Sequence, residues 1–319
     1  KELQYTEKWE EAEVGLGREG FAELFTYIRM IYCKEKARRS ILADFRDHVT
    51  SKTNAVDLVD RVILPYGEAL EDILASAFEA SSNADKVNLS LRWLNMIDNS
   101  DWIPPAILFL AKNRPSSDKI AEFFAELDRL ASGLMILRSN INERIERYAA
   151  VLAEIEAGKD FKAAGSSMQL RKEEKENILR ILDGDLYLGI KTRLYVLLRL
   201  DNSLSGGGAQ YQHGIITIEH VLPQSPAMGS KWVQWFPSES DRTSRVHKMG
   251  NLALLTRRKN SSAQNYDFDQ KKTKYFSVGG ISPFVLTTQV LGEPTWGPEV
   301  IDRRQKDLVA KLAKLWRLD

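Results

Sequence analysis

The sequence GIITIEHVLPQ at residues 214–224 and the sequence HKMGNLALLTRRKN at residues 247–260 decide how we interpret this chain. β-Branched residues dominate residues 214–219, which predicts a strand, and Glu219 and His220 stand at its end. Asn251 begins a second apolar run, and Asn260 follows nine residues later. Side chains that can take part in catalysis or bind a metal ion therefore lie at the ends of segments that the sequence predicts to be regular.

The four polar residues supply groups that hydrolysis of a phosphodiester needs, namely a base and ligands for a cation. His220 can serve as the base, because an imidazole with a pKa of about 6.5 is largely neutral at pH 7. Oxygen ligands such as Glu219 and the Asn260 amide suit Mg²⁺ or Mn²⁺. Asn251 is suited to hold the loop that carries the base. In a regular strand Glu219 and His220 point to opposite faces, so both could flank one ion only if the chain twists there.

The segment from Arg242 to Lys274 is strongly basic, although the whole chain has a net charge of only +1. It contains nine Lys and Arg residues and two acidic residues, so its charge is +7 (nine minus two). A charge run can be a solvated face, but this one overlaps the candidate site. We therefore expect a DNA-facing surface, with phosphate contacts from four residues: Arg257, Arg258, Lys271 and Lys272.

Three short motifs carry a resemblance to a known family: EHVLPQ at 219–224, GNLALL at 250–255 and KNSS at 259–262. They resemble the C-terminal nuclease domain of the GmrSD-type modification-dependent restriction enzymes, which include relatives that sense phosphorothioated DNA in phage defence. The step from Asn251 to Asn260 is also similar to the HNH domain of RNA-guided CRISPR nucleases. Because Asn260 stands in the third motif position, the pattern is an HNN variant of HNH.

The resemblance implies a ββα-metal (HNH) unit near residues 214–276, in which two strands and a helix hold one Mg²⁺ or Mn²⁺ ion. It implies His220 as the general base, Asn251 as the residue that positions it, and Glu219 and Asn260 as metal ligands. The expected function is a metal-dependent DNA endonuclease in bacterial anti-phage restriction. Since such a unit cuts one strand per active site, a monomer should be a nickase, and a double-strand break would need two events or two subunits. The expected partner is double-stranded phage DNA.

Two further expectations concern what accompanies the nuclease unit. Members of this family usually carry an N-terminal sensor with an Asp-Gly-Gln-Gln-Arg signature, which this sequence lacks, so we expect the sensor upstream in a longer protein. The alternative function is a catalytically inactive ββα module that binds DNA or docks a partner. The complete set of four polar residues favours the enzyme.

Composition excludes several other classes of protein. With 319 residues, 43% hydrophobic and 28% charged, the chain is typical of a globular protein of two domains. The sequence has neither an apolar run of about 18 residues nor a signal peptide, so we expect a cytoplasmic protein with no membrane partner. The lone Cys33 allows no internal disulfide and no cysteine-based zinc site.

The fold class that we predict is mainly α, with a helical N-terminal half and a ββα-metal unit among helices in the C-terminal half. Apolar residues at helical spacing recur through residues 1–200. The small, polar segment 157–167 suggests a helical support domain at 1–160 and a nuclease domain at 161–319. We expect helices at 174–182, 186–200 and 299–318, and Asn54 as a helix cap.

Some side chains near the motifs allow two interpretations. His247 could touch phosphate, but a histidine in this position is more often structural. Trp232 and Trp235 could stack on bases, although packing of the insert onto its domain is the better explanation. Tyr266 and Phe268 are expected to anchor the helix that carries Lys271 and Lys272.

Overall fold

The computed structural model describes residues 2–207, 209, 211, 215–256, 265–274, 276–277 and 282–319. The described chain is mostly helical and holds one two-stranded sheet, which confirms the prediction of a mainly α protein. It forms two compact units, Lys1–Arg171 and Lys172–Asp319, whereas the sequence suggested a division after residue 160. None of the described helices combines the length and the apolar composition needed to cross a membrane.

Unit 1 is built from helices and helical turns alone in its described part. Helix α1 bends at Gly17, whose φ of 69° lies outside the helical region. Asn54 caps the short helix Ala55–Leu58 by accepting a hydrogen bond from the backbone of Asp57, as predicted. The elements are α1 (Glu2–Cys33), α2 (Ile41–Phe45), the π-turn η1 (Arg46–Thr50), α3 (Ala55–Leu58), the π-turn η2 (Val59–Ile63), α4 (Leu64–Ala75), α5 (Ala84–Leu94), α6 (Ile103–Asn113), α7 (Ser117–Ile136) and α8 (Ile141–Glu156).

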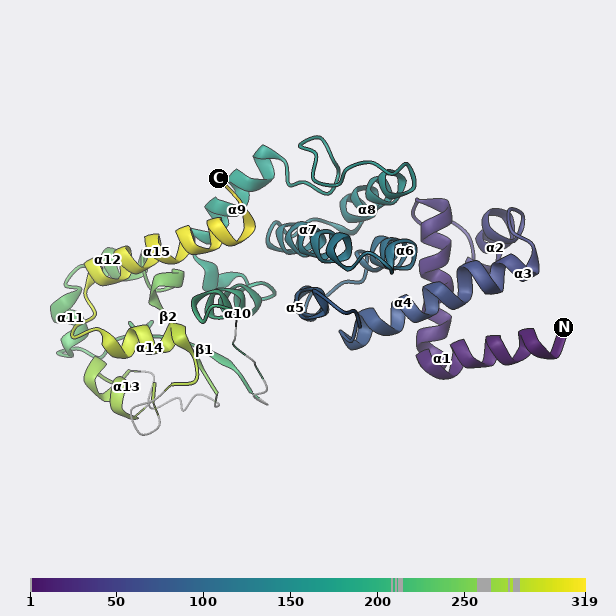
Figure 1. Cartoon of the computed structure of the whole chain (residues 1–319). Helices are drawn as coiled ribbons and strands as arrows, with labels where there is room; N and C mark the ends of the chain where they lie inside the picture. The colour runs from purple at the N-terminus through teal and green to yellow at the C-terminus, as the bar shows by residue number, and fades with distance from the viewer. Residues whose placement is uncertain are drawn as a thin grey trace. The chain divides into compact units, whose positions relative to one another are not determined.

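Unit 2 surrounds its small sheet with helices (Figure 1). Helix α14 packs against the second strand, and α15 packs against the turn that precedes this strand and against α10. The elements are α9 (Lys172–Leu182), the 3₁₀ turn η3 (Leu186–Leu188), α10 (Arg193–Leu204), β1 (Thr217–His220), α11 (Lys231–Trp235), α12 (Glu239–Thr243), the 3₁₀ turn η4 (Met249–Asn251), β2 (Leu252–Leu255), α13 (Phe268–Lys274), α14 (Val285–Gly292) and α15 (Pro298–Trp316).

The single helix predicted over residues 186–200 is wrong in its first half. The chain makes one 3₁₀ turn, leaves helical geometry at Gly189, and begins α10 only at Arg193. Glycine is a poor helix former, and here the Thr192 hydroxyl fills the space that a side chain on Gly189 would need. The break brings Tyr187 to the end of β1, where the candidate site lies.

The sheet pairs β1 and β2 antiparallel, with Glu219 opposite Ala253 and His220 opposite Leu252. Two strands alone are only marginally stable in water, and the structure secures the outer edge of β2 with a side chain. The Thr287 hydroxyl of α14 accepts from Leu254 N at 3.0 Å and donates to Leu254 O at 2.8 Å. This pair replaces the hydrogen bonds that a third strand would make.

Aromatic residues from the insert between the strands and from the segments after β2 pack together in the core of unit 2. Trp232 and Phe268 are fully buried in one cluster with Trp296, and the Trp232 indole N–H donates to Tyr266 O at 2.9 Å. Packing of Trp232, and anchoring of α13 by Phe268, are therefore confirmed. Trp235 packs on the same cluster while remaining partly exposed.

The turn η4 is fastened directly to α15. The buried Arg304 donates to Gly250 O at 2.7 Å and to Leu286 O at 2.8 Å, and burial lowers the pKa of its guanidinium to about 10. The backbone N–H of Gly250 donates to the Gln305 side chain at 2.8 Å. A Cβ at Gly250 would lie 2.5 Å from Ile301 O, so only glycine permits this close approach.

Substituting Gly250→Ala should therefore destabilise unit 2 by about 1–3 kcal/mol, the usual cost of forcing an extra methyl into a packed site. Gly292→Ala is the matched control, because a Cβ there would meet nothing within 4 Å. This control should be neutral or stabilise by up to about 1 kcal/mol. Urea unfolding followed by tryptophan fluorescence measures both, and equal stability of the two variants would contradict the packing argument.

Candidate functional site

Strand β1 buries its acidic residue and its histidine on different faces. Glu219 is 2% exposed and His220 is 3% exposed. The Glu219 carboxylate meets α13, whereas the His220 ring lies against Tyr187 and His247. The alternation expected of a regular strand is thus observed.

Lys271 of α13 is the partner of this strand end. Its side chain is fully buried, and its Nζ lies 3.3 Å from Glu219 Oε1 and donates to His220 O at 2.7 Å. A buried carboxylate needs a compensating charge of this kind. In this arrangement the Lys271 amine is directed at the protein interior, so its place differs from the DNA-facing position expected from the sequence.

Among the described residues, each ring nitrogen of His220 has a polar neighbour. Its Nε2 lies 3.2 Å from His247 Nδ1, and its Nδ1 lies 3.3 Å from Gln224 Nε2. Gln224 is exposed, while His247 is partly buried. His220 therefore stands between a histidine on the protein side and an exposed amide.

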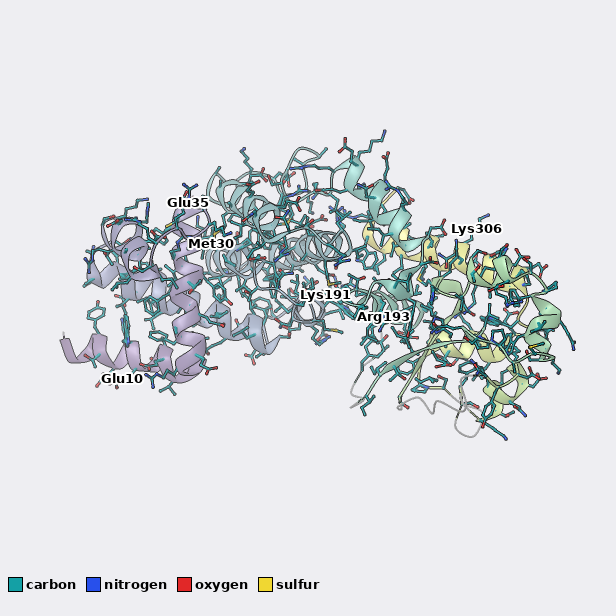
Figure 2. The ribbon with its side chains drawn as sticks, turned by 180° about the vertical axis from the view of Figure 1, so that it is seen from behind. Glu10, Met30, Glu35, Lys191, Arg193 and Lys306 are labelled. Carbon is teal, nitrogen blue, oxygen red and sulfur yellow. The ribbon has the colours of Figure 1, made fainter. Side chains whose placement is uncertain are left out.

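Tyr187 of η3 supports both histidines. Its ring lies 4.1 Å from the His220 ring and stacks on the His247 ring at 5.5 Å with an interplanar angle of 10°. Its backbone N–H donates to His247 O at 3.1 Å. Arg193, labelled in Figure 2 at the start of α10, donates to Tyr187 O at 2.8 Å and places its guanidinium 4.3 Å from the ring centre.

Asn251 joins the segments around the site through its amide group and is itself fully buried. Its Oδ1 accepts from Leu222 N at 2.7 Å and from the Trp296 indole N–H at 3.1 Å. Its Nδ2 donates to Leu222 O at 3.0 Å and to Val246 O at 2.9 Å. Leu222 lies on the loop directly after His220, so Asn251 holds the loop that carries the histidine.

Three of the residues singled out from the sequence, namely Asn260, Arg257 and Arg258, lie outside the described residues. Lys272 is partly buried, and its amine donates to Glu293 O at 2.8 Å and lies 5.2 Å from the centre of the Phe268 ring. Four residues were predicted to contact DNA. Two of them are described, and of these Lys271 is buried whereas Lys272 is partly exposed.

The donor chemistry at Glu219 fits an oxygen-seeking ion such as Mg²⁺. The Glu219 carboxylate is held by Lys271. Metal-ligating carboxylates are commonly held by a second group in this way. Within the described parts of the chain, however, no three Asp, Glu, His or Cys side chains gather as a metal site.

Three features of this cluster were not predicted from the sequence. They are the contacts of Tyr187, the contact of Gln224 and the burial of Lys271. Gln224 follows His220 by four residues on a loop, a spacing that carries no signal outside a helix. Tyr187 was expected inside a longer helix. Lys271 lies in a basic run whose members look alike in the sequence, although Phe268, three residues earlier, marks the buried face of α13.

The fold and this cluster define a helical protein whose second unit holds a buried Glu–His–Asn–Lys cluster at the end of a two-stranded sheet. Residues 172–311 match the family model described as GmrSD restriction endonucleases, C-terminal domain. The match lies entirely within unit 2, and includes both strands and the cluster. The search of curated proteins found no match.

Replacing Lys271 by Met should destabilise unit 2 by about 3–5 kcal/mol, because it leaves the buried Glu219 carboxylate without its counter-charge. Lys274→Met on the same helix is the control. Lys274 is exposed, so this change should cost no more than about 0.5 kcal/mol. Chemical unfolding of the two variants gives the comparison.

The double variant Glu219→Gln, Lys271→Met tests the cause of this loss. It should recover part of the stability, because neither charge remains. If Lys271→Met is as stable as Lys274→Met, the ion pair does not stabilise unit 2.

Proposed function

We propose that the protein is a metal-dependent DNA endonuclease of restriction against phage, and that β1, β2 and α13 form a ββα-metal (HNH) unit. The observation that carries this proposal is the Glu219–His220 pair at the end of β1, held by Asn251, within a segment similar to a restriction endonuclease domain. The reaction would be hydrolysis of a phosphodiester bond.

In this proposal His220 is the general base that takes a proton from the attacking water. Removing a base typically costs about 10²–10⁴-fold in rate. The Asn251 amide positions the base by fixing Leu222, two residues after it. Lys271 holds the carbonyl of His220 and the carboxylate of Glu219 together, which fixes the strand end from its other face.

We propose Glu219 and Asn260 as ligands of one Mg²⁺ or Mn²⁺ ion, with water and phosphate completing its shell. When bound, such an ion supplies positive charge that stabilises the transition state and the leaving oxygen. Asn260 is included because of its place in the HNN pattern.

DNA binding is proposed for the basic segment, through Arg257, Arg258 and Lys272, because its sequence holds nine basic and two acidic residues, and such a charge attracts phosphates. Lys271 is given an internal role instead. A single unit of this kind would nick one strand, and a sensor upstream in a longer protein would choose the DNA. The second candidate is an inactive ββα module that binds DNA or a partner.

The substitution His220→Ala should reduce nicking of supercoiled plasmid by about 10²–10⁴-fold with Mg²⁺ or Mn²⁺ present. DNA affinity should remain nearly unchanged, since a neutral imidazole contributes little charge. Gel analysis of plasmid forms and a binding titration provide the two readouts. His48→Ala, which changes a partly exposed histidine of unit 1, is the control and should cut at the parental rate.

A His220→Ala protein that nicks as fast as the parent would exclude His220 as the base. Parallel loss of binding and cutting, with a lowered melting temperature, would instead identify His220 as a structural residue.

A further inference from the structure

The contacts of the His220 ring indicate which of its two nitrogens carries the proton when the ring is neutral. An amide nitrogen can only donate a hydrogen bond, so the contact from Gln224 Nε2 makes His220 Nδ1 an acceptor. A neutral imidazole carries its proton on one nitrogen. The proton of neutral His220 therefore lies on Nε2, from which it is donated to His247 Nδ1.

The two partners of His220 differ in how firmly they are held. The His247 ring stacks on Tyr187, its carbonyl accepts from Tyr187 N, and Arg193 fixes Tyr187 in turn. Gln224 is exposed on a loop, and its contact with His220 is the longer of the two, 3.3 Å against 3.2 Å. A ligand can displace the exposed amide more easily than the stacked ring.

We propose that His247 is the positioning residue of the base and that it selects the tautomer in which His220 Nδ1 has a lone pair for the attacking water. Gln224 covers that nitrogen until the substrate arrives. This inference rests on the proposed function, with His220 as the base. His247 acts on the reaction only through His220, much as an orienting acceptor fixes a catalytic histidine in other base-assisted sites.

The first part of the experiment compares two substitutions of similar size. Asparagine attaches its amide oxygen to Cγ, where histidine carries Nδ1, so His247→Asn retains an acceptor. His247→Leu has the same shape without an acceptor. We expect His247→Leu to lose about 10–100-fold in kcat on plasmid DNA with little change in KM, and His247→Asn to retain most of the parental rate.

The second part reads the proton position without any reaction. Two-bond ¹H–¹⁵N correlation spectra distinguish the tautomers of the four histidines, and the His220 signals are assigned by their loss in His220→Ala. We expect neutral His220 to carry its proton on Nε2 in the parent and in His247→Asn. In His247→Leu the Nε2 proton loses its acceptor, and the exposed Gln224 amide can turn its oxygen toward Nδ1, so a substantial fraction of His220 should carry its proton on Nδ1.

Three outcomes would overturn the inference. These are a proton on Nδ1 of His220 in the parent, equal rate losses in His247→Asn and His247→Leu, or the parental tautomer of His220 in His247→Leu. If the parent cuts no DNA, the proposed function fails, and the spectra still decide whether His247 selects the tautomer.

Discussion

The buried amide of Asn251 is the interaction on which the arrangement of unit 2 depends. It uses both of its lone pairs and both of its protons, so that it joins the loop after β1, the segment before η4 and the indole of Trp296. Inside a protein such a bond is costly to lose, because each partner would be left buried without water. One side chain at the end of η4, directly before β2, thereby fixes the place of His220 at the end of β1.

Two buried cations, one from α13 and one from α15, hold the segments around this amide. Lys271 of α13 compensates Glu219 and holds the His220 carbonyl, while Arg304 of α15 holds the carbonyls of Gly250 and Leu286. Both cations are buried, and both bind the backbone beside the sheet. A two-stranded sheet of four residues a strand has little stability of its own. These side chains and Thr287 supply what further strands would supply in a larger sheet.

The sequence predicts the parts of this structure that depend on local pattern. The helical character of unit 1, the cap at Asn54 and the burial of Trp232 could all be predicted from neighbouring residues. The loop-holding bonds of Asn251 could be anticipated because an amide is well suited to bind backbone groups. The contact of His220 with His247 spans 27 residues, and the place of Lys271 depends on which face of α13 is buried. Such long-range pairings are set by packing, which a single sequence does not display. The site roles of Glu219, His220, Asn251 and Asn260 remain proposals.

The proposed metal-dependent cleavage is tested most directly by incubating supercoiled plasmid with the purified protein and Mg²⁺ or Mn²⁺, in the presence and absence of a chelator. If the protein is the proposed nuclease, metal converts the plasmid to the nicked circular form and the chelator abolishes this conversion. Intact plasmid under every metal condition, or cutting that the chelator leaves unchanged, would contradict this proposal.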